Sequence, residues 1–145
     1  MPNQPHPPTK VFSKPPSSDG DGNHIHNTIL LGLPSKESQI VLSRLEFVRL
    51  KTHQVLHEPG DALRSGYFCD TGLVSILTVF PDGKSVEVGL VGNEGFVGVP
   101  LVAGLRSAPT RAIAQIEGTA FRIDSETLMP LLPQCPKLER QLVRS

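Results

Sequence analysis

Residues 81–112 read PDGKSVEVGLVGNEGFVGVPLVAGLRSAPTRA, and this stretch decides the fold. It opens on the turn Pro81-Asp82-Gly83-Lys84, where proline suits the first central position and glycine supplies a positive φ. Residues 85–91 then alternate apolar side chains with small or polar ones, which is typical of a strand with one buried face. With the apolar stretch 73–80 before the turn, the pattern predicts a β-hairpin.

Short β-prone segments lie on both sides of this hairpin and are separated by polar or glycine-containing turns. Examples of these turns are Glu58-Pro59-Gly60-Asp61 and Asp70-Thr71-Gly72. Many short strands at close spacing favour a roll or barrel, so we expect a mainly β domain of about eight strands. The strands predicted outside the hairpin cover residues 47–50, 54–57, 67–69, 110–115 and 120–123.

Helices are predicted before and after the strands. After Pro34, Ser35 is the expected N-cap of a first helix, and apolar residues between 40 and 45 give that helix one apolar face. At the other end, Asp124 or Ser125 can cap a helix that runs to Leu131. Pro136 can open a further helix that runs to the last residue.

Composition limits the class of protein. The 145 residues suffice for one domain, and 14 basic residues balance 14 acidic ones, so nothing favours nucleic-acid binding by this chain. No signal peptide and no stretch of roughly 20 apolar residues is present, so we expect a soluble cytoplasmic protein without a membrane span. Residues 1–27 are rich in Pro, Ser, Gly and Asn; we expect a disordered arm there and the domain over residues 28–145.

Three features in fixed order resemble the cyclic-nucleotide-binding domains of Crp/Fnr-type bacterial transcription regulators. They are the turn 58–61 followed by the aromatic and Val-containing segment 67–74, the hairpin around 81–84, and the segment 93–98 followed by 106–112. The resemblance spans about residues 29–145. It implies a double-stranded β-helix, a jelly-roll-like β-roll flanked by short helices, and a regulatory, non-enzymatic function in sensing an effector.

The resemblance also implies a phosphate-binding segment. In the family, backbone N–H groups at a short helix and an arginine hold the cyclic phosphate, while a glutamate accepts the ribose hydroxyl. Gly98 matches the family's glycine, and Arg106 with Ser107 matches the phosphate-binding pair. The candidate ligand-binding residues are therefore Phe96, Gly98, Val99, Arg106, Ser107 and Ala108.

Val99 stands where the family has the ribose-binding glutamate. Valine accepts no hydrogen bond, and a buried hydroxyl left unpaired costs about 1–3 kcal/mol. Pro100 lacks an N–H, and the interval from Gly98 to Arg106 is shorter than in cyclic-AMP-binding members. We therefore expect no cofactor and no standard cyclic-AMP binding, with a cyclic nucleotide or another small anion as the candidate effector.

Two simpler readings of this segment remain open. In one, Arg106 and Arg111 are solvated loop charges, and glycines 95 and 98 serve turns alone. In the other, the chain is a constitutive interaction or dimerisation module whose pocket is filled by its own Val99 and Leu101.

Other chemistry has weaker support in the sequence. His24 and His26 could begin a metal site of a cupin-type enzyme, but no histidine follows His57, so we expect no metal. Cys69 and Cys135 lack the spacing of a zinc, redox or iron–sulfur site. We expect Cys69 to be a core residue, with a thiol sensor as the alternative, and no catalytic residue is predicted.

Family members continue beyond the β-roll into a dimerisation helix and a DNA-reading helix-turn-helix. This sequence ends at Ser145, at the start of the expected C-terminal helix. The resemblance therefore implies DNA binding only through a C-terminal domain missing from this sequence, and a homodimer in the full-length protein.

Overall fold

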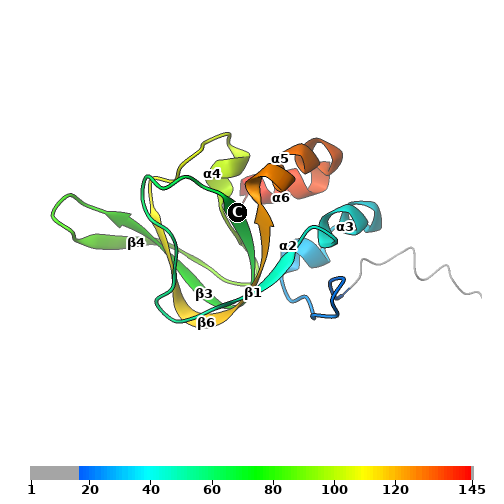
Figure 1. Cartoon of the computed structure of the whole chain (residues 1–145), viewed down its shortest axis with the longest axis horizontal. Helices are drawn as coiled ribbons and strands as arrows, with labels where there is room; N and C mark the ends of the chain where they lie inside the picture. Colours follow the sequence, from blue (N-terminus) through cyan, green and yellow to red (C-terminus); the bar gives the residue numbers. More distant parts are fainter. Residues whose placement is uncertain (1–16, 145) are drawn as a thin grey trace, which may run out of the picture.

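Two long antiparallel strands organise the structure, a computed structural model that describes residues 17–144 (Figure 1). They are β3 (Ser65–Val79) and β6 (Arg111–Asp124), and their pairing runs from Ser65 opposite Asp124 to Leu77 opposite Arg111. The sheet order is β1-β6-β3-β4, with β2 paired to β6 and β5 paired to β3. The shorter strands are β1 (Glu46–Leu50), β2 (Val55–His57), β4 (Ser85–Val91) and β5 (Phe96–Val97). The mainly β fold class is confirmed, with six strands in this part of the chain.

The structure has fewer strands than the roughly eight expected because pairs of predicted strands are continuous. Segments 67–69 and 73–80 were expected as separate strands but form one strand, β3, and the two segments expected within 110–123 form β6. The register shifts three times between Cys69 and Val74, where the β3–β6 ladder is bulged. Gly72 has φ +82° there, and a Cβ on Gly118 would lie 2.0 Å from the Thr71 carbonyl oxygen. These glycines serve a bulge and a close strand approach, not chain-reversing turns.

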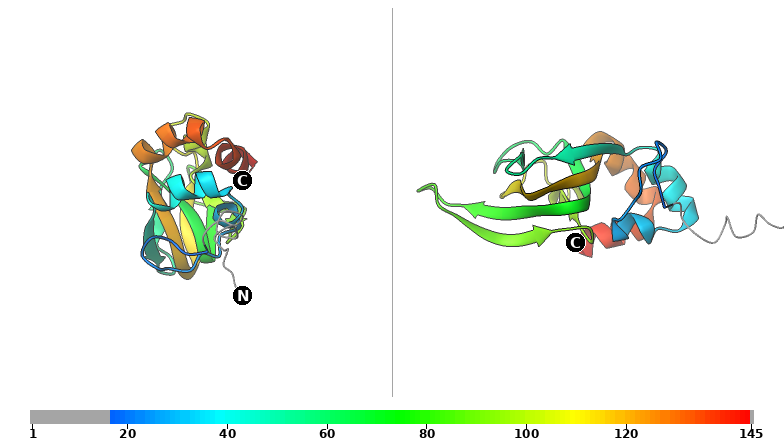
Figure 2. Two further views of the ribbon diagram at one scale, coloured as in Figure 1. Left: turned by 90° about the vertical axis from the view of Figure 1, so that its right-hand side faces the viewer. Right: turned by 90° about the horizontal axis from the view of Figure 1, so that it is seen from below.

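The predicted hairpin is present, and its turn is closed by a Phe80 N–H to Lys84 oxygen bond of 2.8 Å. The expected burial of its apolar face is wrong, since Val86, Val88 and Leu90 are each at least half exposed. β4 pairs only with β3, and the hairpin projects from the roll on the side away from the helices (Figure 2). A projecting edge strand has no second layer to cover its apolar residues.

The helices gather at the opposite end of the sheet (Figures 1 and 2). Predicted helices at 125–131 and from Pro136 are both present, while Pro34 and not Ser35 occupies the N-cap position of the first one. Phe68 and Phe121, both fully buried, face the main core beneath these helices. The helices are α2 (Thr28–Leu31), α3 (Ser35–Leu42), α4 (Val99–Val102), α5 (Ser125–Leu131) and α6 (Pro136–Arg144), with a 3-10 turn η1 (Leu132–Gln134).

A buried carboxylate joins α3 to α6, the last helix described. Glu37 on α3 is 8% exposed, and its two oxygens accept the backbone N–H groups of Lys137 (3.1 Å) and Leu138 (2.9 Å). These N–H groups belong to the first turn of α6, where a helix has no internal acceptors and attracts negative charge. Glu37 therefore caps a helix 100 residues further along the chain.

Residues 17–27, which were expected in the disordered arm, pack against the roll ahead of α2. Ser18 pairs with His24 as an isolated bridge, Ile25 is 5% exposed, and Asn27 is fully buried. Residues 1–16 of the predicted arm lie outside the described residues.

Asn27 explains why composition misled the prediction. Its Nδ2 donates to the carbonyl oxygens of Cys69 (2.6 Å) and Gly95 (2.9 Å), and its Oδ1 accepts the N–H groups of Ile29 and Leu30. One side chain thus caps α2 and ties it to two distant parts of the roll. The segment is held mainly by polar contacts, which a count of apolar residues does not register.

Candidate functional site

Residues 96–108, which we call the cassette, begin at β5 and continue through α4 into a loop. The ring of Phe96 packs against that of Phe68 with centroids 4.8 Å apart. Gly98 follows with φ +122°, and a Cβ there would lie 3.1 Å from the Cα of Gly66. Both the backbone conformation and the close approach therefore require glycine at position 98.

Side chains of α4 fill the space beneath it. Val99, half-buried, packs against the main core under the helices, and Leu101 is buried in a small cluster with Leu63 and Ala108. Pro100 occupies the first turn of the helix, where its missing N–H costs no internal bond. Val99, which the resemblance predicts at the family's glutamate position, thus contributes to packing.

The end of the cassette is fixed by its backbone, while two of its polar side chains face solvent. The Leu63 N–H donates to the Arg106 carbonyl oxygen (2.8 Å), and Ala62 and Ser107 form an isolated bridge. Arg106 and Ser107 are exposed, Ala108 is buried, and the Arg106 guanidinium bonds no group in residues 17–144.

Arg111 differs from the solvated loop charge considered above. It lies on β6, and its Nε donates to Glu58 Oε1 at 2.6 Å, so it forms an ion pair with the turn after β2. Its charge is therefore already matched by a carboxylate. Of the two candidate arginines, Arg106 alone keeps a guanidinium with no bonded group among the described residues.

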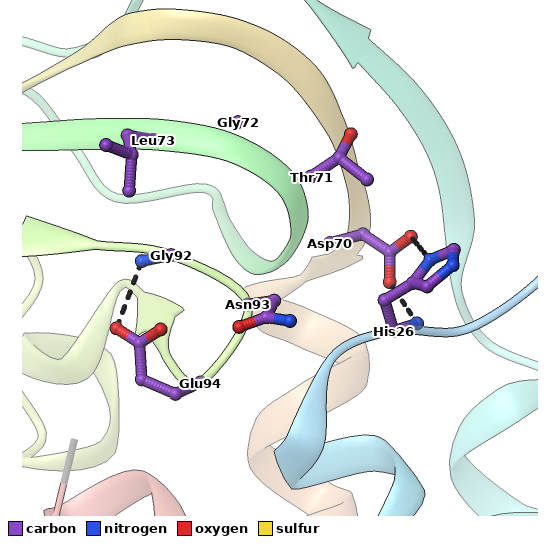
Figure 3. A pocket seen from close by; sticks show the side chains of 8 residues that line it. All are labelled: His26, Asp70, Thr71, Gly72, Leu73, Gly92, Asn93 and Glu94. Carbon is purple, nitrogen blue, oxygen red and sulfur yellow. Dashed lines mark hydrogen bonds and ion pairs between the residues drawn. The ribbon is translucent and has the colours of Figure 1, made fainter.

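A cavity of about 370 Å³ lies between the N-terminal segment and the start of the cassette (Figure 3). Asp70 is its most buried polar residue: Oδ1 accepts the N–H groups of His26 (2.6 Å) and Asn27 (3.0 Å), and Oδ2 lies 3.0 Å from His26 Nδ1. On the other side, Glu94 accepts the Gly92 N–H. These polar groups hold the segment 26–27 and the turn at 92–94 in place, and none of the predicted ligand-binding residues lines this cavity.

A second cavity of about 450 Å³ opens at the end of the roll where β2, β3 and β6 meet. Tyr67 and Arg122 stand opposite each other in the β3–β6 register, and Arg122 also bonds Glu46 on β1. Burial lowers the pKa of His57, against the effect of nearby Asp61 and Glu58, and burial raises the pKa of Tyr67. The lining residues are Leu56, His57, Asp61–Ser65, Tyr67 and Arg122.

The second cavity has no local signal in the sequence and was not predicted. Its polar residues come from two segments more than 50 positions apart, and only the strand register brings Arg122 beside Tyr67. The turn at residues 58–61 was recognised, but nothing local indicated a cavity beside it. Again, none of the predicted ligand-binding residues lines it.

Cys69 is 2% exposed, and burial raises the pKa of its thiol to about 12. The expected core position of Cys69 is thus confirmed, and Cys135 is buried as well. Between residues 17 and 144, no three His, Cys, Asp or Glu side chains gather as metal ligands would. Over the same range, no helix is both long and apolar enough to cross a bilayer.

Comparison with known proteins gives a family and a shared fold. Residues 47–135 match the family model described as the cyclic nucleotide-binding domain. No curated protein sequence matches the chain significantly.

Solved structures with the same fold include sensory domains of bacterial regulators. The N-terminal domain of a transcriptional regulator from Streptomyces coelicolor A3(2) is 21% identical, with a TM-score of 0.65 over 83% of this chain and 85% of that one. The sensor domain of the transcriptional regulator DNR from Pseudomonas aeruginosa is 16% identical, with a TM-score of 0.66 over 80% and 78%. Thermus thermophilus catabolite activator protein is 17% identical, with a TM-score of 0.68, and the match covers 80% of this chain but 55% of that chain.

Proposed function

Because the chain belongs to the cyclic nucleotide-binding domain family, we propose that it is an effector-sensing regulatory domain that does not bind cyclic nucleotides in the family's usual mode. The observation that carries the proposal is the position of Val99, which packs into the main core where the family's glutamate would meet a ribose. A nucleotide bound there would leave its ribose hydroxyl unpaired, at a cost of about 1–3 kcal/mol.

The proposed effector contact is an anionic group at Arg106 and Ser107. Both side chains are exposed, and the guanidinium bonds no group in the part of the chain that the structure describes. A charge-assisted bond to an arginine is among the stronger polar contacts, so a small anion can bind without the ribose contact.

Backbone contacts supply a route from this contact to the C-terminal helices. The segment 60–63 pairs with residues 106–108. The backbone carbonyl oxygen of the next residue, Arg64, accepts the Ser125 N–H at 2.8 Å, at the start of α5. An effector that binds one arrangement of the cassette more tightly would shift the population of arrangements at α5.

The role in a longer protein is part of the same proposal. The chain spans about half the length of the Thermus regulator, and the neighbours named above include a transcriptional regulator's sensor domain. We place the domain in a cytoplasmic, homodimeric regulator of the Crp/Fnr type, in which a further domain binds DNA. The proposal assigns no catalytic step to the chain.

Calorimetric and thermal-shift titrations test the cassette. We expect no saturable heat with cyclic AMP or cyclic GMP, and a rise in melting temperature with inorganic phosphate that Arg106→Ala removes. Arg44→Ala, which removes another exposed arginine in the turn after α3, is the matched control and should keep the phosphate response. Tight cyclic-nucleotide binding, or an unchanged phosphate response in Arg106→Ala, contradicts the proposal.

A second function is favoured by one observation, the filling of the cassette by its own Val99 and Leu101. In that case the domain is a constitutive interaction module with no effector. The same titrations separate the two functions, because an interaction module shows neither nucleotide nor phosphate stabilisation. Its oligomeric state should also be unaffected by either compound.

A further inference from the structure

The second cavity, between β2, the turn 58–64, β3 and β6, holds polar groups that the fold does not satisfy. The Nε2 atom of His57 is buried and has no hydrogen-bond partner among the described residues. Arg64 is exposed at the cavity wall, and its guanidinium likewise bonds no group in residues 17–144. Native structures pair nearly all buried polar atoms, so an unpaired one in its lining marks this cavity as a candidate ligand site.

The other charges of the cavity are partly engaged. Arg122 bonds the carboxylate of Glu46 and is therefore neutralised. Asp61 uses Oδ2 to accept the Glu58 N–H at 3.1 Å, and no bond to Oδ1 is seen within the described part of the chain. A ligand would thus meet one unmatched guanidinium and one carboxylate with a free oxygen, in a cavity also lined by the His57 imidazole and the hydroxyl-bearing Ser65 and Tyr67.

We propose that this cavity is a ligand site, separate from the cassette, for a small α-hydroxy or α-amino carboxylate. The ligand carboxylate binds Arg64, and its hydroxyl or ammonium group donates to Asp61. Apolar side chains at the edge, Leu56 and Leu63, accommodate a short aliphatic portion. The volume of about 450 Å³ lies in the range of roughly 300–1,000 Å³ that small-molecule clefts occupy.

The charge pattern selects this class over simple anions and cations. A phosphate or dicarboxylate would bring a second negative charge into a cavity that already holds Asp61, and a plain amine would meet Arg64 with like charge. A compound with a carboxylate on one carbon and a donor on the next offers a partner of the right kind to each group. The pattern also distinguishes this cavity from the cassette, where Arg106 is the charged group.

Ligand binding here acts on the segment that connects the cassette to α5. Ala62 and Leu63 pair with the cassette backbone, and the Ser65 hydroxyl bonds Asp124 Oδ1 at 3.3 Å, next to the first residue of α5. A ligand that holds Asp61 and Arg64 therefore restricts the segment 61–65, which contacts both the cassette and the start of α5. The binding itself does not depend on the proposed cassette function.

Amide chemical-shift titrations with L-serine and with L-lactate test the proposal on the whole chain. We expect saturable shifts at residues 56–57, 61–65, 67 and 122, and no saturable shift with the neutral analogue 1,2-propanediol. Arg64→Gln should weaken the binding of both carboxylates at least about tenfold, which is the loss of affinity expected for one charge-assisted hydrogen bond. Asp61→Asn should weaken the binding of L-serine more than that of L-lactate, because the ammonium group of serine loses its counter-charge.

Two controls keep the two sites distinguishable. Arg106→Ala should leave both titrations unchanged, whereas it removes the phosphate response of the cassette. Arg44→Gln, at an exposed position in the turn after α3, checks that loss of an arginine elsewhere does not weaken binding. Absence of saturable shifts with both carboxylates, equal shifts with 1,2-propanediol, or unchanged binding in Arg64→Gln would overturn the proposal; urea unfolding of each variant confirms that the fold is retained.

Discussion

Replacing Asn27 with alanine should destabilise the domain strongly, although the residue lies in a polar segment before the first helix. The substitution removes an acceptor for the N–H groups of Ile29 and Leu30 and a donor to the carbonyl oxygens of Cys69 and Gly95. Asn27 is fully buried, so water cannot replace these partners without opening the segment.

The magnitude follows from the separate contacts of Asn27. Loss of a helix cap costs about 1 kcal/mol. The Gly95 oxygen still accepts the Cys69 N–H at 3.3 Å after the substitution, whereas the Cys69 oxygen loses the Asn27 donor. A buried acceptor left unpaired costs about 1–3 kcal/mol. The sum is about 2–4 kcal/mol, a large part of the roughly 5–15 kcal/mol that stabilises a domain.

Urea unfolding followed by circular dichroism measures this loss, with two comparison variants. Asn93→Ala removes an exposed amide side chain and should change the free energy of unfolding by less than about 0.5 kcal/mol. Asn27→Asp keeps an acceptor for the helix N–H groups but removes both donations, so it should also destabilise the domain. A wild-type stability for Asn27→Ala, or for Asn27→Asp, would refute the assignment of the cost to the cross-links.

Three further predictions concern the strands and titratable groups. Gly118→Ala places a Cβ 2.0 Å from the Thr71 oxygen and should cost at least about 2 kcal/mol in urea unfolding, while Gly20→Ala, with open space, should cost little. Since burial raises the pKa of Cys69 to about 12, iodoacetamide at neutral pH should alkylate it only after unfolding; equal rates in folded and urea-unfolded protein would refute this. Burial lowers the pKa of His57, so the unfolded chain binds a proton at this imidazole more readily than the folded one. The melting temperature should therefore fall as the pH drops below about 6.5, and it should fall less in His57→Gln.

Features with a local sequence signal were predicted well. The hairpin turn at 81–84 and the start of α6 at Pro136 depend on residues adjacent in sequence, and both are present. The position of Gly98 at the start of a short helix was expected from the family resemblance, and the structure has α4 directly after it. The predicted ligand-binding role of the cassette residues stays a prediction.

Features that depend on distant partners were not predicted. The burial of Val88 was expected from alternation, but alternation cannot tell an edge strand that projects into solvent from one covered by a second layer. The anchoring by Asn27 depends on carbonyl groups 42 and 68 positions away. Cavity residues such as Arg122 likewise acquire their neighbours only through strand register, which no short window of sequence contains.

The capping of α6 by Glu37 has a consequence for the order of folding during synthesis. Glu37 is synthesised about 100 residues before Lys137 and Leu138, so the hydrogen bonds that join α3 to α6 form only after the C-terminal segment has been made. Pairing of β1 with β6 is similarly delayed, since Glu46 meets Arg122 across 76 positions. Contacts of such separation slow folding and leave the first half of the nascent chain with exposed apolar residues until the last helix emerges.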